Sequence, residues 1–222
     1  MPRRPTRTVA TVLLHGWEGS GPGHWQSWLA ERLHAAGREV RFPGLPDADH
    51  PALDPWLAAL GTTLEGLPDD GFDVVAHSLG AVLWLHHVAA AGESPRPARV
   101  ALVAPPSPRT AIPEIASFFP VPLDVDVVRR SAGGGPPARA VGGSEGERGV
   151  PTGVVASAGG TVLVGSDADP YTPEGVAVAY GLPLKMSVTI VAGGGHLNTD
   201  AGYGEWPAVL DWCGRDNLAF IA

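Results

Sequence analysis

The chain has 222 residues, the size of one domain or at most two small ones. Hydrophobic residues make up 44% of the chain and charged residues 17%, so it can bury a sizeable core. The formal net charge of −8 disfavours nucleic acid and anionic membrane surfaces as partners, and the single Cys213 excludes an internal disulfide and a multi-cysteine metal site.

Short β-branched runs alternate along the chain with helical periodicities. The first apolar run, 9–14, follows a basic opening but is too short for a signal peptide, so we expect a buried strand. Strands are predicted at 8–14, 39–42, 72–77, 99–104, 161–164 and 187–191. Helices are predicted at 24–36, 54–64, 79–91, 173–180 and 206–212, with Asp54 as an N-cap before Pro55.

This alternation predicts an α/β fold in one domain over 1–222, with a mostly parallel sheet of about six strands and helices on both faces. The strands are apolar nearly throughout, as a sheet covered on both sides requires. No apolar run approaches the length of a membrane span, so we expect a cytoplasmic protein without membrane contact.

The segment 73–81 carries the clearest chemical signal. An apolar strand leads directly into Ser78, and a helix begins at Leu79. Such a sharp turn exposes the serine hydroxyl at the carboxyl edge of the sheet, and it needs small neighbours such as Ala76 and Gly80. Gly80 fits the G-x-S-x-G pattern, whereas Ala76 departs from its first glycine. The segment predicts a nucleophilic serine.

A serine nucleophile needs a base and an acid that orients the base. In hydrolases of this topology the acid and then the histidine follow the serine, each after a later strand. Here an acidic turn with Asp167 and Asp169 follows the strand at 161–164, and His196 follows three glycines after the strand at 187–191. We favour Asp169 as the orienting acid, with Asp167 bracing the turn as the alternative.

The oxyanion donors are predicted to be backbone amides. In this topology one donor is the N–H after the nucleophile, here Leu79, and the other comes from a loop after an earlier strand. The loop after the first strand has the required glycines, which makes the N–H of Trp17 the candidate. His15 is expected to brace this loop, and His77 to pack the elbow.

Four segments of this chain resemble the small α/β-hydrolases of the YdeN and retinoblastoma-binding-protein type. They are the strand-His-Gly opening at 15–16, Ala-His-Ser-Leu-Gly at 76–80, Asp-Pro-Tyr-Thr-Pro at 169–173, and the most specific one, Gly-His-Leu-Asn followed by Gly-Tyr-Gly-Glu-Trp-Pro, at 195–207. The resemblance covers roughly 8–106 and 160–213. It implies a compact α/β-hydrolase that acts as a serine carboxylesterase, with Ser78, Asp169 and His196 at the triad positions.

The predicted function is hydrolysis of a small ester by a Ser-His-Asp acyl-enzyme mechanism, with no cofactor and no metal. The alternatives are a thioesterase or amidase with the same triad, and a partner-binding protein on a hydrolase scaffold. Dinucleotide binding is disfavoured because the glycines at 19–23 follow G-x-G-x-G spacing and no acid ends the second strand. His86, His87 and the turn at 47–50 are expected to hold no metal.

Glycine and proline are abundant, at 30 and 23 residues, and they are concentrated at 131–149. The segment 107–160 is therefore predicted to form a variable cap or loop insertion, mobile at 131–149. Apolar candidates for the acyl pocket are Trp17, Trp84, Phe118 and Phe119, although such residues more often belong to the core.

Overall fold

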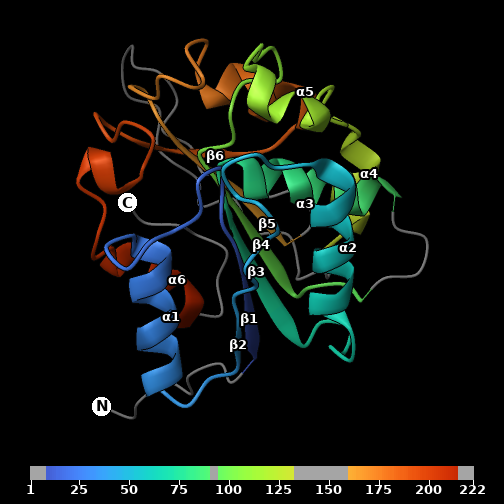
Figure 1. The fold of residues 1–222 in the computed structure, drawn as a ribbon, viewed down its shortest axis with the longest axis vertical. Helices are drawn as coiled ribbons and strands as arrows, with labels where there is room; N and C mark the ends of the chain where they lie inside the picture. The colour runs from blue at the N-terminus through green and yellow to red at the C-terminus, as the bar shows by residue number, and fades with distance from the viewer. Residues whose placement is uncertain (1–8, 91–94, 133–159, 215–222) are drawn as a thin grey trace, which may run out of the picture.

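The computed structural model describes residues 9–90, 95–132 and 160–214. In these ranges six strands form one parallel sheet in the order β2-β1-β3-β4-β5-β6 (Figure 1). The strands are β1 (Ala10–Leu14), β2 (Val40–Arg41), β3 (Phe72–His77), β4 (Arg99–Val103), β5 (Thr161–Ser166) and β6 (Val188–Val191). The predicted parallel α/β architecture is confirmed.

Helices cover both faces of the sheet (Figure 1). One face carries α1 (Trp25–Ala35) and α6 (Pro207–Gly214), and the other carries α2 (Leu53–Leu64), α3 (Leu79–Ala90) and α4 (Val125–Arg130). The shorter helical segments are η1 (Pro113–Phe118), η2 (Ala177–Gly181), α5 (Leu182–Leu184) and η3 (Thr199–Ala201). No helix in the described ranges is both long and apolar enough to cross a bilayer.

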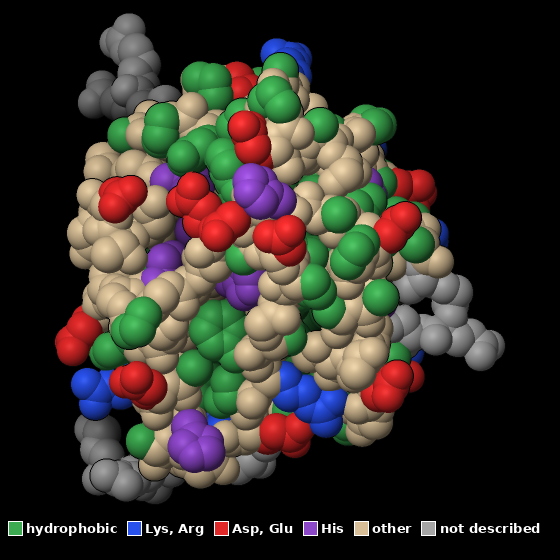
Figure 2. All heavy atoms as spheres, in the orientation of Figure 1, with side chains coloured by type: hydrophobic (Ala, Val, Ile, Leu, Met, Phe, Trp, Pro, Cys, Tyr) green, Lys and Arg blue, Asp and Glu red, His purple; other side chains and the backbone are tan. Residues whose placement is uncertain are grey.

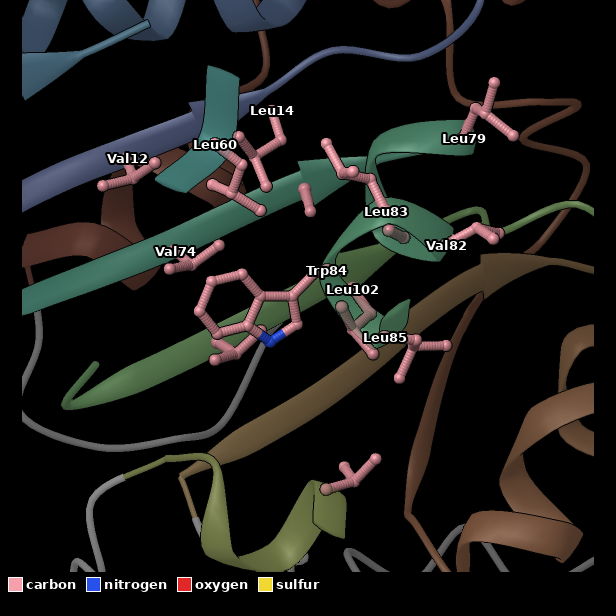
Figure 3. Close-up of a cluster of buried hydrophobic side chains, with 14 of the residues drawn as sticks. Val12, Leu14, Leu60, Val74, Leu79, Val82, Leu83, Trp84, Leu85 and Leu102 are labelled. Carbon is pink, nitrogen blue, oxygen red and sulfur yellow. The ribbon is translucent and has the colours of Figure 1, made fainter. Parts of the chain in front are cut away.

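Two cores form because successive strand side chains point to opposite faces. On β3, Val74 belongs to the core under α2 and α3, whereas Val75 belongs to the core under α1 and α6. Figure 3 shows the first of these cores, where Trp84 of α3 lies over strand side chains such as Val74 and Leu102. With both faces buried, the chemistry of this fold is confined to the strand ends and their loops.

Two helix starts differ from the sequence prediction. Helix α2 begins at Leu53 with Ala52 as its N-cap, so the prediction of Asp54 as the N-cap was wrong. Asp54 and Pro55 lie in the first turn, where backbone N–H groups have no partner within the helix and proline is therefore tolerated. The helix predicted from Pro173 starts later because Gly175 has a φ of +81°, which a right-handed helix cannot contain.

The predicted cap is described only in part. Over 107–132, η1 and α4 pack against α3, and they contribute Ile115, Phe118 and Val128 to the core. Residues 133–159 lie outside the described ranges, so the mobility of 131–149 stays a prediction.

A buried ion pair joins β3 and β4 at the amino-terminal ends of these strands, opposite the edge at which the strands end. Asp73 is fully buried and accepts hydrogen bonds from Arg99 Nη2 at 2.5 Å and Nε at 3.2 Å. Arg99 Nη1 also donates to the carbonyl oxygen of Trp212, and Arg38 Nη1 donates to that of Cys213. The pair therefore connects the end of α6 to the sheet.

We expect Asp73→Asn to lower the free energy of unfolding by about 3–5 kcal/mol, because it leaves a buried guanidinium uncompensated. Urea denaturation measures this loss. Asp69→Asn is the matched control: Asp69 lies 4.0 Å from Arg96 at the surface, both side chains more than half exposed. Loss of this surface pair should cost less than about 1 kcal/mol. Equal losses in the two variants would contradict a structural role for the buried pair.

Candidate active site

Ser78 stands at the turn between β3 and α3, with its backbone in the left-handed region at a φ of +53°. Only a tightly packed surrounding holds a non-glycine residue there. Two glycines allow the loop after β1 to approach this turn. A Cβ at Gly80 would lie 2.5 Å from the carbonyl oxygen of His15, and one at Gly16 would lie 2.7 Å from the Cβ of Ser78. The sequence thus produces a half-buried, strained serine beside a close backbone loop.

A continuous chain of hydrogen bonds runs from Ser78 through His196 to Asp169. Ser78 Oγ lies 2.8 Å from His196 Nε2, and His196 Nδ1 lies 2.9 and 3.0 Å from the two carboxylate oxygens of Asp169. His196 and Asp169 are both buried. Because Nδ1 donates to the carboxylate, Nε2 of the neutral ring is free to accept the serine proton.

The two candidate acids have different neighbours. Asp169 contacts the imidazole, whereas Asp167 Oδ1 accepts a 2.7 Å hydrogen bond from the backbone N–H of Gly193. Asp169 Oδ1 also accepts the N–H of Tyr171, which fixes its carboxylate. The geometry therefore assigns bracing of the glycine loop to Asp167 and contact with the histidine to Asp169.

The loop that carries His196 must reach across the sheet, because β4 and β5 separate β6 from β3. Besides Asp167, two side chains from outside the loop hold its backbone. His77 Nε2 lies 3.0 Å from the carbonyl oxygen of His196, and Trp25 Nε1 donates to that of Leu197 at 2.7 Å. His77 thus does more than pack the elbow, since it positions the adjacent histidine loop.

The loop after β1 places Trp17 beside the serine. Its backbone N–H has no hydrogen-bond partner among the described residues, and both Trp17 and Leu79 line the pocket around Ser78. His15 braces this loop: Nδ1 contacts the carbonyl oxygen of Gly16 at 2.8 Å, and Nε2 accepts the N–H of Leu45. Burial lowers the pKa of His15, which keeps its ring neutral.

The pocket at Ser78 has a volume of about 210 Å³. Its lining includes Pro106, Ile115, Tyr171 and Asn198. Of the four predicted acyl-pocket residues only Trp17 lines it. Trp84 and Phe118 are buried in the core under α2 and α3, and Phe119 packs against that core.

Sequence reasoning missed three residues around this pocket. Tyr171 packs on the imidazole of His196, with ring centroids 4.4 Å apart. Gln26 is fully buried and connects the carbonyl oxygen of Leu14 to the hydroxyl of Ser20. It lies three residues before Leu29 on the same helix face, and a polar residue on an apolar face is the signal that could have found it. The third is His24, the N-cap of α1.

His86, His87 and the turn at 47–50 carry side chains of metal-ligating types. In the described ranges no group of three or more His, Cys, Asp or Glu is arranged to hold a metal ion. His86 Nε2 lies 2.8 Å from the carbonyl oxygen of Phe118, which gives this side chain a structural contact.

Stability should fall on mild acidification because two histidines are buried in neutral form. Burial lowers the pKa of His24 to about 4 and that of His77 well below 6.5, and the nearby His196 adds to both shifts. Between pH 6.5 and these lowered pKa values the unfolded chain binds more protons than the folded chain. As the pH falls through this range, the free energy of unfolding should therefore decrease by up to about 1.4 kcal/mol per pH unit for each histidine. Urea denaturation from pH 7 to 4.5 measures the slope. His24→Asn should make it shallower, and an unchanged slope would contradict this assignment.

Comparison with known proteins shows the family of this chain. The family model described as serine hydrolase matches residues 11–214. A 73-residue stretch is 34% identical to the hydrolase YdeN of Bacillus subtilis, covering 33% of this chain and 38% of that protein. The aligned stretch therefore spans well under half of the relative's length.

Solved structures show the same fold over nearly the whole chain. The crystal structure of B. subtilis YdeN superposes with a TM-score of 0.71 at 21% identity, covering 92% of this chain and 96% of that one. A YdeN-like hydrolase from Pectobacterium atrosepticum gives a TM-score of 0.63 at 22% identity, covering 93% and 89%. Together with the family match, these likenesses show that this chain is a member of the serine hydrolase family with the α/β-hydrolase fold.

Proposed function

We propose that this serine hydrolase is a carboxylesterase-like enzyme that cleaves a small ester with Ser78, His196 and Asp169 as its triad. The observation that carries the proposal is the unbroken contact from Ser78 Oγ to His196 Nε2 at 2.8 Å and from His196 Nδ1 to Asp169 at 2.9 Å. This arrangement supplies a nucleophile, a base and an orienting carboxylate in hydrogen-bond contact.

In the proposed reaction, His196 Nε2 takes the hydroxyl proton as Ser78 Oγ attacks the ester carbonyl. The negative charge that develops on the carbonyl oxygen is stabilised by the N–H groups of Trp17 and Leu79. His196 then protonates the departing alcohol, which leaves an acyl-serine. A water molecule, deprotonated by His196, attacks the acyl-serine, and His196 returns the proton to Ser78 Oγ as the acid is released. Asp169 stabilises the imidazolium in both halves, and no cofactor is required.

The pocket supports a small substrate. Its volume of about 210 Å³ is below the roughly 300–1,000 Å³ of pockets that enclose drug-sized ligands. The pocket lining mixes a few apolar groups, such as Ile115 and Pro106, with many polar ones. We therefore place short-chain esters ahead of long-chain lipids as substrates.

A fluorophosphonate probe tests the chemistry, and p-nitrophenyl esters from acetate to decanoate test the substrate. We expect the probe to label Ser78, identified by peptide mass spectrometry, and kcat/KM to be highest for acetate to butyrate. If the probe labels Ser78 but the protein cleaves thioesters or amides and not esters, the function would be assigned to a thioesterase or an amidase. A folded protein that the probe does not label would favour a partner-binding role over catalysis.

A further inference from the structure

His24 lies against the candidate active site without a role in the triad. It lines the pocket with Ser78 and is 95% buried, with only 5% of its surface exposed. Its ring centroid is 5.0 Å from that of His77, which in turn is 5.2 Å from that of His196. A polar side chain in this position is close enough to contact a molecule bound at Ser78.

The hydrogen bonds of His24 determine which of its ring nitrogens carries the proton. Nδ1 accepts the backbone N–H of Gln26 at 3.1 Å, which caps the first turn of α1. A nitrogen that accepts cannot carry a proton, so the neutral ring bears its proton on Nε2. Its pKa of about 4 keeps the ring in this neutral form at physiological pH.

Nε2 of His24 has no hydrogen-bond partner among the described residues, yet it is not sealed from solvent. This donor faces the pocket with no acceptor from the described residues, and a bound molecule with a suitable oxygen could accept its hydrogen bond. Trp17 and Leu79 already supply the candidate donors for the carbonyl oxygen under attack. The donor on His24 is therefore available to another part of the substrate.

The charges around the pocket restrict this acceptor. Glu18 and Asp200 line the pocket, and no Lys or Arg of the described ranges does. In Figure 2, carboxylate side chains gather around histidines in the upper half of the face, with no Lys or Arg side chain among them. A carboxylate on the substrate would be repelled here, so an uncharged oxygen is favoured.

We infer that His24 is a substrate-binding residue whose Nε2–H donates a hydrogen bond to an uncharged oxygen of the substrate, an ether, hydroxyl or carbonyl oxygen near the scissile carbonyl. The inference rests on the proposed esterase function. It narrows the substrate class to small esters that have a further uncharged oxygen outside the ester group. This oxygen can belong to the acyl or to the alcohol part.

Two pairs of esters of matched shape test the inference. The acyl pair is p-nitrophenyl methoxyacetate and p-nitrophenyl butyrate, and the alcohol pair is 2-methoxyethyl butyrate and butyl butyrate. In each pair an ether oxygen replaces one methylene. For each substrate, kcat/KM of the variant is divided by that of the wild type, which removes the difference in intrinsic reactivity between the ether and the alkyl ester.

His24→Asn keeps an oxygen in the place of Nδ1 to cap α1 but has no donor in the place of Nε2. In one of the two pairs, we expect the kcat/KM of this variant to fall about five- to tenfold further for the ether ester than for the matched alkyl ester. The pair that shows this difference identifies whether the acyl or the alcohol part of the substrate carries the oxygen. His34→Asn, an exposed site on the same helix, should leave both ratios unchanged. Equal losses for ether and alkyl esters in both pairs would overturn the inference while leaving the esterase assignment intact.

A binding measurement separates this inference from the proposed function. In Ser78→Ala protein labelled with ¹⁵N-histidine, the His24 Nε2 resonance, assigned by its loss in His24→Asn, should shift with an ether ester and not with its alkyl match. A shift without ester turnover by the wild type would reject the esterase and retain the His24 site. Turnover without such a shift would reject the site alone. Faster turnover of mono-p-nitrophenyl succinate than of the butyrate ester would overturn the requirement for an uncharged oxygen.

Discussion

Ser78→Ala is expected to reduce kcat/KM for p-nitrophenyl butyrate by about 10⁴- to 10⁶-fold, a larger loss than that expected for Asp169→Asn. The variant removes the only serine oxygen in contact with His196 in the described ranges, at 2.8 Å from Nε2. Residual activity is expected because the proposed oxyanion donors, the backbone amides of Trp17 and Leu79, are unchanged in this variant. Ester turnover measured at 405 nm quantifies the loss.

The non-additivity expected of the proposed triad gives this prediction a second check. His196→Ala alone and Ser78→Ala with His196→Ala should lose about as much activity as Ser78→Ala alone, because the residues act as one unit. Ser131→Ala is a matched serine control, since within the described residues its hydroxyl donates a hydrogen bond to the carbonyl oxygen of Val128, outside the pocket lining. Turnover in Ser78→Ala comparable to that of Ser131→Ala would exclude Ser78 as the nucleophile.

Asp169→Asn is expected to reduce kcat by about 10³- to 10⁴-fold, the second large effect. The asparagine amide can donate a hydrogen bond to Nδ1 of His196 and thereby stabilise the tautomer that carries its proton on Nε2. In this tautomer Nε2 cannot accept the serine proton. The substitution also removes the negative charge that stabilises the imidazolium in the proposed mechanism. The effect should appear in kcat more than in KM, because Asp169 does not line the pocket.

Asp167→Asn provides the matched control for this variant. Its amide oxygen can still accept the N–H of Gly193, which the Asp167 carboxylate accepts at 2.7 Å, so we expect a loss of less than about tenfold for this single neutral-for-charged exchange. The two variants differ by two positions in one loop and have the same change in charge. A larger loss in Asp167→Asn than in Asp169→Asn would reverse the assignment of the acid.

Local sequence signals were sufficient for the sheet and for the candidate triad. The strands at 72–77 and 161–166 are apolar and lead into Ser78 and into the acidic turn, and the alternation of strands with helices predicts that they run parallel in one sheet. Parallel strands bring their carboxyl ends to one edge of the sheet, which is why segments 118 residues apart in sequence meet at Ser78 and His196.

Local signals were insufficient where contacts from other elements decide the outcome. The helix starts at Leu53 and after Gly175 depend on packing and on one backbone torsion angle, and propensity misplaced both. Trp84 and Phe118 were candidates for the acyl pocket until the positions of α3 and η1 placed them in the core. An aromatic residue has the same apolar character in both places, and only its neighbours distinguish them.

The composition, apolar strands and loop motifs by themselves determined a parallel α/β-hydrolase fold and the order of serine, acid and histidine, because these depend on periodicity and on residues next to one another in the chain. Only the tertiary structure decided that Asp169 rather than Asp167 contacts His196, that His77 holds the histidine loop, and that the Nε2 of His24 lies unpartnered at the pocket. These depend on directions of side chains from separate strands, and such directions exist only once the sheet has brought the loops together.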